Sequence, residues 1–204
     1  SENQTAVTTI SATDPDAGTT VTYSITGGAD ASKFQINGSS GELSFKTVPN
    51  YESPTDSGAN NGYVVKVRAT DGALHDEQTI TVNVTNVNES PSIASNGGGA
   101  SATKSVSENQ TPVTTVSATD PDAGTTITYS ISGGADGGKF NINANTGVLT
   151  FKTAPNYENP TDSGTNNSYV VKVRASDGAL HDEQTITVSV TNVNESPSIA
   201  SNGG

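Results

Sequence analysis

The feature that most constrains the fold of this chain is an internal repeat with a period of 106 residues. The segment TNVNESPSIASNGG occurs at residues 85–98 and again at 191–204, and residues 1–98 align with 107–204 without an insertion or deletion. Of these 98 aligned positions, 80 are identical. Repeats of about 20 to 45 residues must stack to bury a core, whereas a repeat of this size can form its own core. The sequence therefore predicts two globular modules of one type.

The composition excludes several classes of protein. The chain of 204 residues has no Cys, and it carries 21 acidic against 9 basic residues, which gives a formal net charge of −12. Disulfides and thiolate metal sites are therefore absent, and the negative charge would repel nucleic acids and anionic membranes while attracting cations. No apolar run approaches the length of a membrane span. We expect neither nucleic-acid binding nor membrane insertion.

Period-two patterns of β-branched residues predict strands. YVVKVRAT at 63–70 and TITVNVTNV at 79–87 alternate apolar with polar residues, and clusters of Gly, Asn, Asp and Pro bound them. KFQINGSSGELSF at 33–45 has two short apolar runs on either side of a Gly-containing turn, which predicts a hairpin. About seven short strands per repeat indicate an all-β chain with two sandwiches of antiparallel sheets.

Oxygen-bearing side chains gather between the predicted strands. Calcium takes about six to eight oxygen ligands, and a D-x-D spacing lets two carboxylates reach one ion. Asp, Asn, Gly and Pro are also the ordinary turn formers, so one such loop alone does not indicate calcium. Each repeat has five of these loops, which in the first repeat are SEN at 1–3, TDPDAG at 13–18, PNYE at 49–52, ATDG at 69–72 and TNVNESP at 85–91.

The order of these motifs along each repeat resembles that of the cadherin repeat. In that family the corresponding motifs are Glu-Asn, A-x-D-x-D, F-x-I-x-x-x-T-G-x-I, L-D-R-E, A-x-D and D-x-N-D-N-x-P, at similar spacings over about 110 residues. The resemblance covers both repeats, and the near-identical copies rich in Thr and Asn are most similar to cadherin-like repeats of large bacterial extracellular or surface proteins. It implies a Greek-key β-sandwich of the cadherin and immunoglobulin-like type for each repeat.

The resemblance implies a calcium site where one repeat ends and the next begins. Its expected ligands are Glu2, Glu52, Asn86, Val87, Asn88 and Glu89 from the first repeat with Asp120, Asp122 and Asp177 from the second. Asn50 and Asn86 stand where the family usually has Asp. The six carboxylates would place about six negative charges in a small volume, where pairs near 4 Å repel by roughly 4 kcal/mol at an intermediate dielectric. We expect two calcium ions there, with one to three as the range.

The same pattern implies incomplete sites at the outer ends of the pair. Asp14, Asp16 and Asp71 would need ligands from a preceding repeat. Four more residues would need a following repeat, namely Glu108, Glu158, Asn194 and Glu195.

Domain boundaries follow from where the family begins its first strand, just after the closing Pro. We expect repeat 1 at residues 1–90 without its own first strand, repeat 2 at 91–196, and the start of a truncated third repeat at 197–204. Segment 91–106 would then be the first strand of repeat 2, kinked at Gly97 to Gly99.

The expected function is a calcium-binding pair of repeats in a secreted or cell-surface adhesin or scaffold, where calcium stiffens the chain and supports adhesion or self-association. The partners would be neighbouring repeats, with a homophilic, surface or polysaccharide partner beyond them. The alternative is a carbohydrate-binding module, for which an exposed Tyr51 or Tyr157 beside another Tyr would be evidence. With one His per repeat and no Cys, no nucleophile and base stand out, so we expect no enzyme. Asp56 with Asn60 forms either an additional cation site or an Asx-turn cluster.

Overall fold

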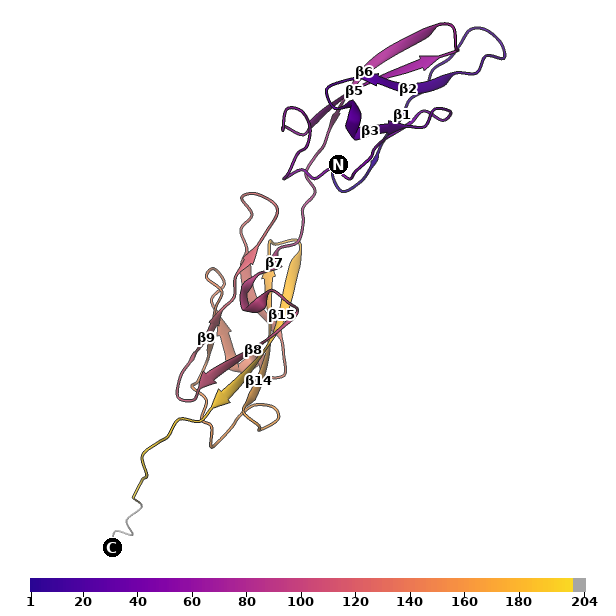
Figure 1. Ribbon diagram of the computed structural model, residues 1–204. Coiled ribbons are helices and arrows are strands. Elements are labelled where there is room, and N and C mark those ends of the chain that lie inside the picture. Colours follow the sequence, from indigo (N-terminus) through magenta and orange to yellow (C-terminus); the bar gives the residue numbers. More distant parts are fainter. Residues whose placement is uncertain (200–204) are drawn as a thin grey trace. The chain divides into compact units, whose positions relative to one another are not determined.

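The computed structural model describes residues 1–199 and divides into two compact units, Ser1–Val87 and Asn88–Gly204 (Figure 1). Both units are built from β-strands, and the helical segments of the described chain are single 3₁₀ turns of three residues. This confirms the predicted all-β fold. No helix in residues 1–199 has the length and apolar character needed to cross a membrane. The last five residues of the predicted third-repeat segment 197–204 lie outside the described residues.

The first unit packs two three-stranded sheets against each other (Figure 1). One sheet has the order β1-β4-β3 and the other β2-β5-β6. A 3₁₀ turn, η1, leads directly into β3. The elements are β1 (Ala6–Thr9), β2 (Thr22–Gly27), η1 (Ala31–Lys33), β3 (Phe34–Ile36), β4 (Glu42–Phe45), β5 (Gly62–Thr70) and β6 (His75–Asn83).

The second unit repeats this plan, adds β7 and β8 before it, and adds the short strand β10 within it. Its sheets have the orders β11-β14-β15-β8, β12-β13-β9 and β10-β7. The elements are β7 (Ser92–Ile93), η2 (Ser95–Gly97), β8 (Ser101–Ser107), β9 (Pro112–Thr115), β10 (Ala118–Thr119), β11 (Thr128–Gly133), η3 (Gly137–Lys139), β12 (Phe140–Ile142), β13 (Val148–Phe151), β14 (Ser168–Ser176) and β15 (His181–Thr191).

The predicted hairpin at 33–45 is confirmed as β3 and β4, which pair antiparallel with Phe34 opposite Phe45. Asn37 starts the turn by accepting the N–H groups of Ser39 and Ser40 on its side-chain oxygen. Gly41 has φ of 73°, and a Cβ there would lie 2.1 Å from a backbone oxygen of the adjoining strand. Only glycine fits both this left-handed conformation and this close approach.

Three aromatic rings hold the two sheets of unit 1 together. Phe34 and Phe45 stack with their ring centroids 4.6 Å apart, and Tyr63 meets Phe45 edge to face at 5.0 Å. All three are buried, and Val65 and Val67 of β5 continue the same apolar face. The alternation predicted for 63–70 therefore places Tyr63, Val65 and Val67 in the core.

The two units differ most at the outer edge of their long hairpin, which is β5–β6 in unit 1 and β14–β15 in unit 2. In unit 2, β8 pairs in parallel with β15 along its whole length, from Ser101 opposite Thr185 to Ser107 opposite Thr191. In unit 1 no described strand pairs with the outer edge of β6, the counterpart of β15. Ile186 is therefore fully buried, whereas its counterpart Ile80 is only half-buried. The strand β8 thus completes a core that β6 leaves partly open.

A short segment before β8 closes the same side of unit 2. Ile93 of β7 is 1% exposed, and its N–H donates to Asp182 Oδ2 at 2.8 Å. Farther along, the buried Gln184 donates to the carbonyl of Gly99 at 2.8 Å and accepts from Asn96 at 3.2 Å. Residues 92–107 therefore satisfy both the apolar and the polar groups that β15 presents.

This difference predicts how unit 1 can be stabilised. Placing the sequence of residues 91–106 directly before Ser1 should add the missing strand, bury Ile80 and Val82, and raise the melting temperature of unit 1 by more than about 5 °C. Calorimetry of the extended and parent chains measures the change. A control extension with Ser at the position copied from Ile93 should give a clearly smaller rise. Equal melting temperatures for the extended and parent chains would contradict the prediction.

An ion-pair cluster lies on the face of each long hairpin that points away from the core. Glu183 on β15 accepts both Nε and Nη2 of Arg174, at 3.0 and 2.8 Å, and also contacts Lys172. The hydrogen bond from Lys172, followed by those from Arg174, lowers the pKa of Glu183 to about 2 from an ordinary value of 4.5. Because the folded pKa is depressed, this carboxylate stabilises the fold above pH 4.5, and the contribution is lost as the pH falls toward 2.

We expect Glu183→Gln to flatten the loss of stability between pH 4.5 and about 2, because the variant has no carboxylate to protonate in that window. Melting temperatures measured by circular dichroism over this range test it. Glu42→Gln is the matched control, since Glu42 is exposed and forms no ion pair within the described chain. An acid response of Glu183→Gln as steep as that of the parent would refute the assignment.

Candidate metal centre

The first residues of each repeat bring a buried carboxylate to the end of the sandwich. Glu2 is 2% exposed, and its two oxygens accept the N–H groups of Tyr51 at 2.7 Å and Val87 at 2.8 Å. Its own N–H donates to the carbonyl of Thr85 at 3.0 Å. One side chain thus ties the start of the repeat, the PNYE loop and the closing segment together.

Glu52 and Asn86 lie in the same place at the end of unit 1. Asn86 Nδ2 donates to Glu52 Oε1 at 3.3 Å. Glu52 follows Tyr51 in the PNYE loop. Because Glu2 accepts the N–H of Tyr51, this contact brings Glu2 close to the backbone of Glu52. Unit 1 therefore groups four of the predicted ligands, Glu2, Glu52, Asn86 and Val87.

Unit 2 groups the other five predicted ligands around the turn between β14 and β15 and the loop that follows β10. Asn88 Nδ2 donates to Asp177 Oδ2 at 2.7 Å, and the N–H of Glu89 donates to Asp122 Oδ2 at 2.8 Å. The D-P-D loop closes on itself, because the N–H of Asp122 donates to Asp120 Oδ1 at 2.9 Å. The segment that follows Val87 therefore runs between the two acidic loops of unit 2.

One carboxylate oxygen in this group has no hydrogen-bond partner among residues 1–199. Asp120 Oδ2 is buried and accepts no hydrogen bond, although its sister oxygen is used by Asp122. A buried carboxylate oxygen without a donor is costly, because it loses its hydration and gains nothing in return. A hard cation supplies the interaction that this oxygen lacks.

The far end of unit 2 repeats the arrangement of Glu2. Glu108 is 1% exposed and accepts the N–H groups of Tyr157 and Val193, each at 2.8 Å. Glu158 accepts from Asn192, and Glu195 accepts from Asn109 at 2.8 Å. Carboxylate oxygens of Glu108, Glu158 and Glu195 all lie within 4.8 Å of one another. Three predicted outer ligands are thus brought together, and Asn194 is exposed beside them.

The other outer group lies at the opposite end of unit 1. Asp14 Oδ1 accepts the N–H of Asp16 at 2.8 Å, and Asp71 Oδ1 accepts those of Ala73 and Leu74 at 2.7 and 2.6 Å. The three aspartates line a cavity of about 260 Å³. Their counterparts in the second repeat are Asp120, Asp122 and Asp177, so both copies build this end in the same way.

Hydrogen bonds keep several of these carboxylates ionised. The pKa of Asp177 lies below its ordinary value of 3.8, chiefly because Asn88 donates to it and then because Ala179 and Leu180 do. The N–H groups of Tyr157 and Val193 lower the pKa of Glu108 in the same way. Ionised carboxylates are the form that binds a metal, so these sites are charged at neutral pH.

The loop with Asp56 has the geometry of an Asx-turn cluster. Asp56 is 6% exposed, and its oxygens accept the N–H groups of Gly58, Asn60 and Asn61 at 3.0 to 3.1 Å. Burial raises the pKa of Asp56, but these backbone hydrogen bonds outweigh it and the pKa lies below 3.8. Because backbone donors occupy both oxygens, the geometry favours the turn over an additional cation site.

Asp182 and the lysines that flank the β3–β4 and β12–β13 hairpins are not among the predicted site residues. Asp182 receives the N–H of Ile93 and so positions the start of the second repeat. Lys33 and Lys46 stand immediately before Phe34 and after Phe45, so the hairpin pairing already visible in the sequence could have shown that they are neighbours.

Together, the strands and the acidic loops define a tandem β-sandwich module that carries oxygen ligands at the ends of its sandwiches. The profile of the Cadherin domain matches residues 1–85 and 103–191, and the chain belongs to the cadherin family. Cadherin domains are adhesion modules and not enzymes, in agreement with the predicted lack of catalysis.

Several much longer curated animal proteins are similar to this chain. Mouse (Mus musculus) Protocadherin Fat 4 is 34% identical over 197 residues, which cover 93% of this chain and 4% of that protein. The Protocadherin-like wing polarity protein stan of Drosophila melanogaster is 31% identical over 202 residues, covering 94% of this chain and 5% of that protein. The chain thus spans about a twentieth of the length of these curated relatives, and the matches do not support the predicted bacterial source.

Solved structures agree on the fold. Mouse cadherin-23 EC22-24 aligns at 25% identity with a TM-score of 0.52, covering 93% of this chain and 59% of that one. Human protocadherin-24 EC1-2 aligns at 20% identity with a TM-score of 0.56, covering 87% of this chain and 84% of that one. The second likeness shows the fold alone.

The contact between Asn88 and Asp177 yields a prediction about ionisation. Asn88→Ala should raise the pKa of Asp177 toward 3.8, because the amide hydrogen bond is the main cause of the depression. Titration of the Asp177 carboxyl carbon by nuclear magnetic resonance measures the change. Asn194→Ala, the same substitution at the equivalent Asn of the next closing segment, should leave Asp177 unaffected. An unchanged Asp177 pKa in Asn88→Ala would show that the amide contributes nothing.

Proposed function

We propose that this chain is a pair of calcium-binding cadherin repeats from an extracellular or cell-surface adhesin or scaffold. Calcium would be held where the first repeat ends and the second begins, and it would stiffen that part of the chain. The observation that carries the proposal is the buried Asp120 Oδ2, an acceptor without a donor, within a group of ionised carboxylates.

The donor set suits calcium. Carboxylates, side-chain amides and backbone carbonyls are hard oxygen ligands, and calcium prefers these to nitrogen or sulfur. The two ligand groups are joined by the peptide bond between Val87 and Asn88. A shared site would therefore take Glu2, Glu52 and Asn86 from unit 1 with Asn88, Glu89, Asp120, Asp122 and Asp177 from unit 2, and Val87 would contribute through its backbone.

The outer cluster supports this assignment by repetition. Glu108, Glu158 and Glu195 are the counterparts of Glu2, Glu52 and Glu89, and their carboxylates lie together inside one unit. Three carboxylates at this separation repel one another unless cations neutralise them. The same three residues in the first repeat would then be the acidic half of the shared site.

The number of ions follows from charge. Six carboxylates would carry about six negative charges, two calcium ions would leave about two, and a third ion would neutralise the group. Asn50 and Asn86 reduce the acidity relative to the family pattern, so we propose two ions with a range of one to three. Extracellular modules bind calcium with dissociation constants of about 10⁻⁴ to 10⁻³ M, which suits a calcium-rich exterior.

The wider setting is also a proposal. Relatives named protocadherins have many times the length of this chain, so neighbouring repeats would be its first partners. A homophilic or surface partner would act through the whole parent protein, and a large bacterial surface protein remains a prediction from the Thr- and Asn-rich copies. Domain boundaries at 90 and 196 likewise remain predictions.

A polysaccharide-binding module remains the alternative. Tyr51 and Tyr157 are 38% and 39% exposed. The close aromatic pairs of the described chain, however, involve only the core rings of Phe34, Phe45, Tyr63 and their counterparts. The paired aromatic platform that would favour this function is therefore lacking among residues 1–199.

Variants on the two sides of the proposed site test it. If both repeats contribute to one site, Glu52→Gln in unit 1 and Asp120→Asn in unit 2 should each weaken calcium binding by at least about tenfold, because each removes a charged ligand. Isothermal titration calorimetry of the full chain gives affinity and stoichiometry, and small-angle scattering with and without a chelator gives the stiffening.

Glu42→Gln removes the same charge from an exposed strand position and should bind calcium like the parent. Loss of binding in only one of the two site variants would mean that one repeat holds the ions alone. Scattering curves that do not change on chelation would remove the stiffening role.

A further inference from the structure

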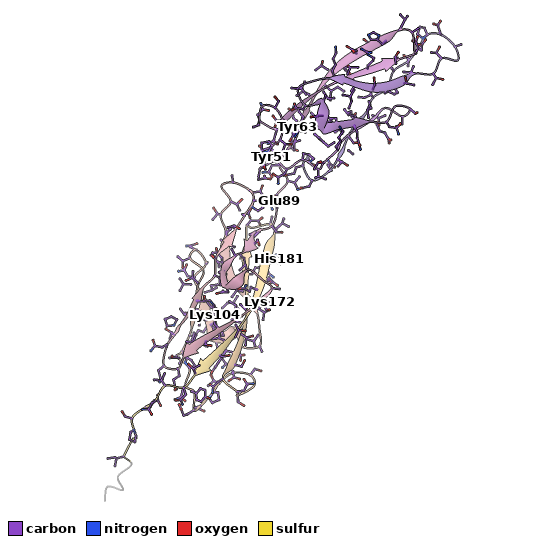
Figure 2. All side chains as sticks on the ribbon, in the orientation of Figure 1. Tyr51, Tyr63, Glu89, Lys104, Lys172 and His181 are labelled. Atoms are coloured by element: carbon purple, nitrogen blue, oxygen red, sulfur yellow. The ribbon has the colours of Figure 1, made fainter. Side chains whose placement is uncertain are left out.

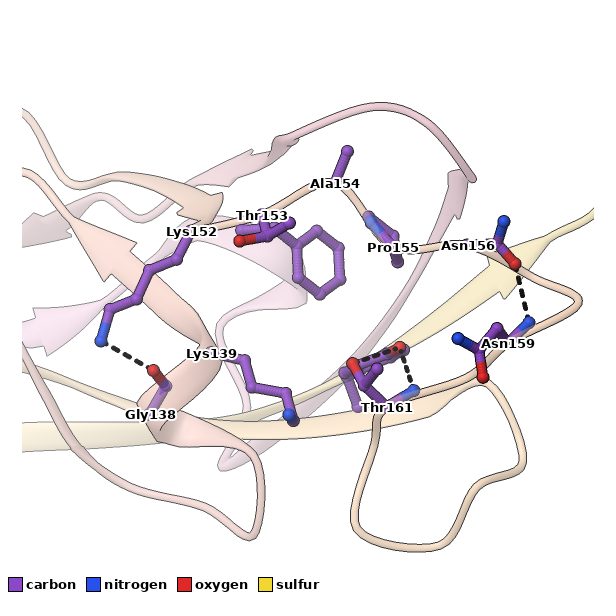
Figure 3. A pocket seen from close by; sticks show the side chains of 11 residues that line it. Gly138, Lys139, Lys152, Thr153, Ala154, Pro155, Asn156, Asn159 and Thr161 are labelled. Atoms are coloured by element: carbon purple, nitrogen blue, oxygen red, sulfur yellow. Dashed lines mark hydrogen bonds between the residues drawn. The ribbon is translucent and has the colours of Figure 1, made fainter.

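Each unit has a pocket between a short hairpin and the loop that precedes the long hairpin. The short hairpin is β3–β4 in unit 1 and β12–β13 in unit 2, and the loop precedes β5 or β14. The pocket measures about 440 Å³ in unit 2 and about 380 Å³ in unit 1, and the two are equivalent through the 106-residue offset. Figure 3 shows the pocket of unit 2, with Lys139 and Lys152 at one end and Asn156 and Asn159 at the other. The calcium proposal makes no use of this cavity.

The pocket of each unit is lined by two lysines, although the chain as a whole is acidic. Neither cavity has Asp or Glu among its lining residues, although the chain carries 21 acidic residues. Four of the nine basic residues form ion pairs on the long hairpins, namely Lys66, Arg68, Lys172 and Arg174. Of the five others, Lys33 and Lys46 line one pocket, Lys139 and Lys152 line the other, and only Lys104 lies elsewhere. The positive charge that the fold does not neutralise is therefore concentrated in the two cavities.

The hairpin fixes the two lysines of each pocket side by side. Lys139 precedes β12 and Lys152 follows β13, and the N–H of Lys152 donates to the carbonyl of Lys139 at 2.8 Å. Lys33 and Lys46 have the same 2.8 Å backbone contact in unit 1. The backbone contact therefore places both lysines at the same end of each pocket, where an anion can meet either ammonium group.

One ammonium of each pair is already held in place. Lys152 Nζ donates to the carbonyl of Gly138 at 2.7 Å, and Lys46 Nζ donates to that of Ser32 at 3.0 Å (Figure 3). An ammonium has three donors, so two remain for a ligand. Anchoring of this kind lowers the entropy that the side chain would lose on binding.

The other residues that line the pocket indicate what kind of ligand it can hold. Ala154 and Pro155 form the apolar wall of the pocket between its two ends, and the nearly buried rings of Phe151 and Tyr169 close the pocket at its back. Thr153, Asn156 and Asn159 add hydroxyl and amide groups. A cavity of this volume suits a ligand of one or two rings, with an apolar face and polar edges.

We propose that each repeat binds a carboxylate-bearing sugar ring in this pocket. The paired lysines would hold the carboxylate, the apolar wall would take one face of the ring, and the hydroxyl and amide groups would hydrogen-bond its hydroxyls. A second copy of this chain would meet the pocket with a net charge of −12, and the mutual repulsion of two such chains opposes that occupant. A single acidic ring carries one negative charge and avoids most of this cost.

The test titrates the full chain with sodium glucuronate and follows backbone amide signals by nuclear magnetic resonance. Saturable shifts are expected at residues lining both pockets. Glucose, which lacks the carboxylate, and acetate, which lacks the ring, should each bind at least about tenfold more weakly. Ionic strength is held constant, and the titration is run with calcium and with a chelator. Binding in this pocket should be the same in both, which separates this inference from the calcium proposal.

Charge variants locate the site. K139Q/K152Q should abolish the shifts of unit 2 and leave those of unit 1, K33Q/K46Q should do the reverse, and K139R/K152R should retain part of the binding. K104Q is the matched control, because Lys104 on β8 carries an unpaired charge outside both cavities (Figure 2). Circular dichroism confirms that each variant is folded.

Three results would overturn the proposal. Equal shifts with acetate and glucuronate would indicate simple ion pairing, and a K104Q variant that binds as weakly as K139Q/K152Q would indicate a general charge effect. Self-association that depends on the pocket lysines, measured by sedimentation without glucuronate, would identify a second copy as the occupant.

Discussion

The structure depends on a buried glutamate near the start of each repeat. Glu108 accepts the N–H groups of Tyr157 and Val193, and Glu2 does the same with Tyr51 and Val87. One carboxylate thus fixes three segments that are far apart in sequence. Backbone hydrogen bonds satisfy the oxygens of both glutamates, and this allows a nearly inaccessible carboxylate to sit at the end of the sandwich.

The acidic loops gain their order from this anchor. Tyr51 and Val87 are neighbours of Glu52, Asn86 and Asn88, so fixing the backbone of the first two positions the side chains of the others. Where the repeat closes on Glu108, three carboxylates are brought within 4.8 Å of one another. The chain and its backbone hydrogen bonds hold these carboxylates close together, so they repel one another. A bound cation would offset this repulsion.

Local patterns in the sequence predicted the strands and the hairpin well. Alternation in 63–70 was sufficient because each side chain's face depends only on the pleat, and the turn at Gly41 needed only local glycine chemistry. The anchoring by Glu2 was harder to foresee, since it joins residues 49 and 85 positions apart. The grouping of candidate ligands came from the order of family motifs and not from periodicity. The lysine pockets were missed because each depends on a hairpin and on a loop that packs beside it.

The parallel pairing of β8 with β15 also determines how a repeat carries tension. The chain reaches the first residue of β8 after the segment 88–100 and leaves through the last residue of β15, and these two residues lie at opposite ends of the paired segment. A pull along the chain therefore slides the two strands past each other, and the whole row of hydrogen bonds resists at once instead of opening one by one. A repeat that contains this strand pair therefore resists tension by shearing of the paired strands.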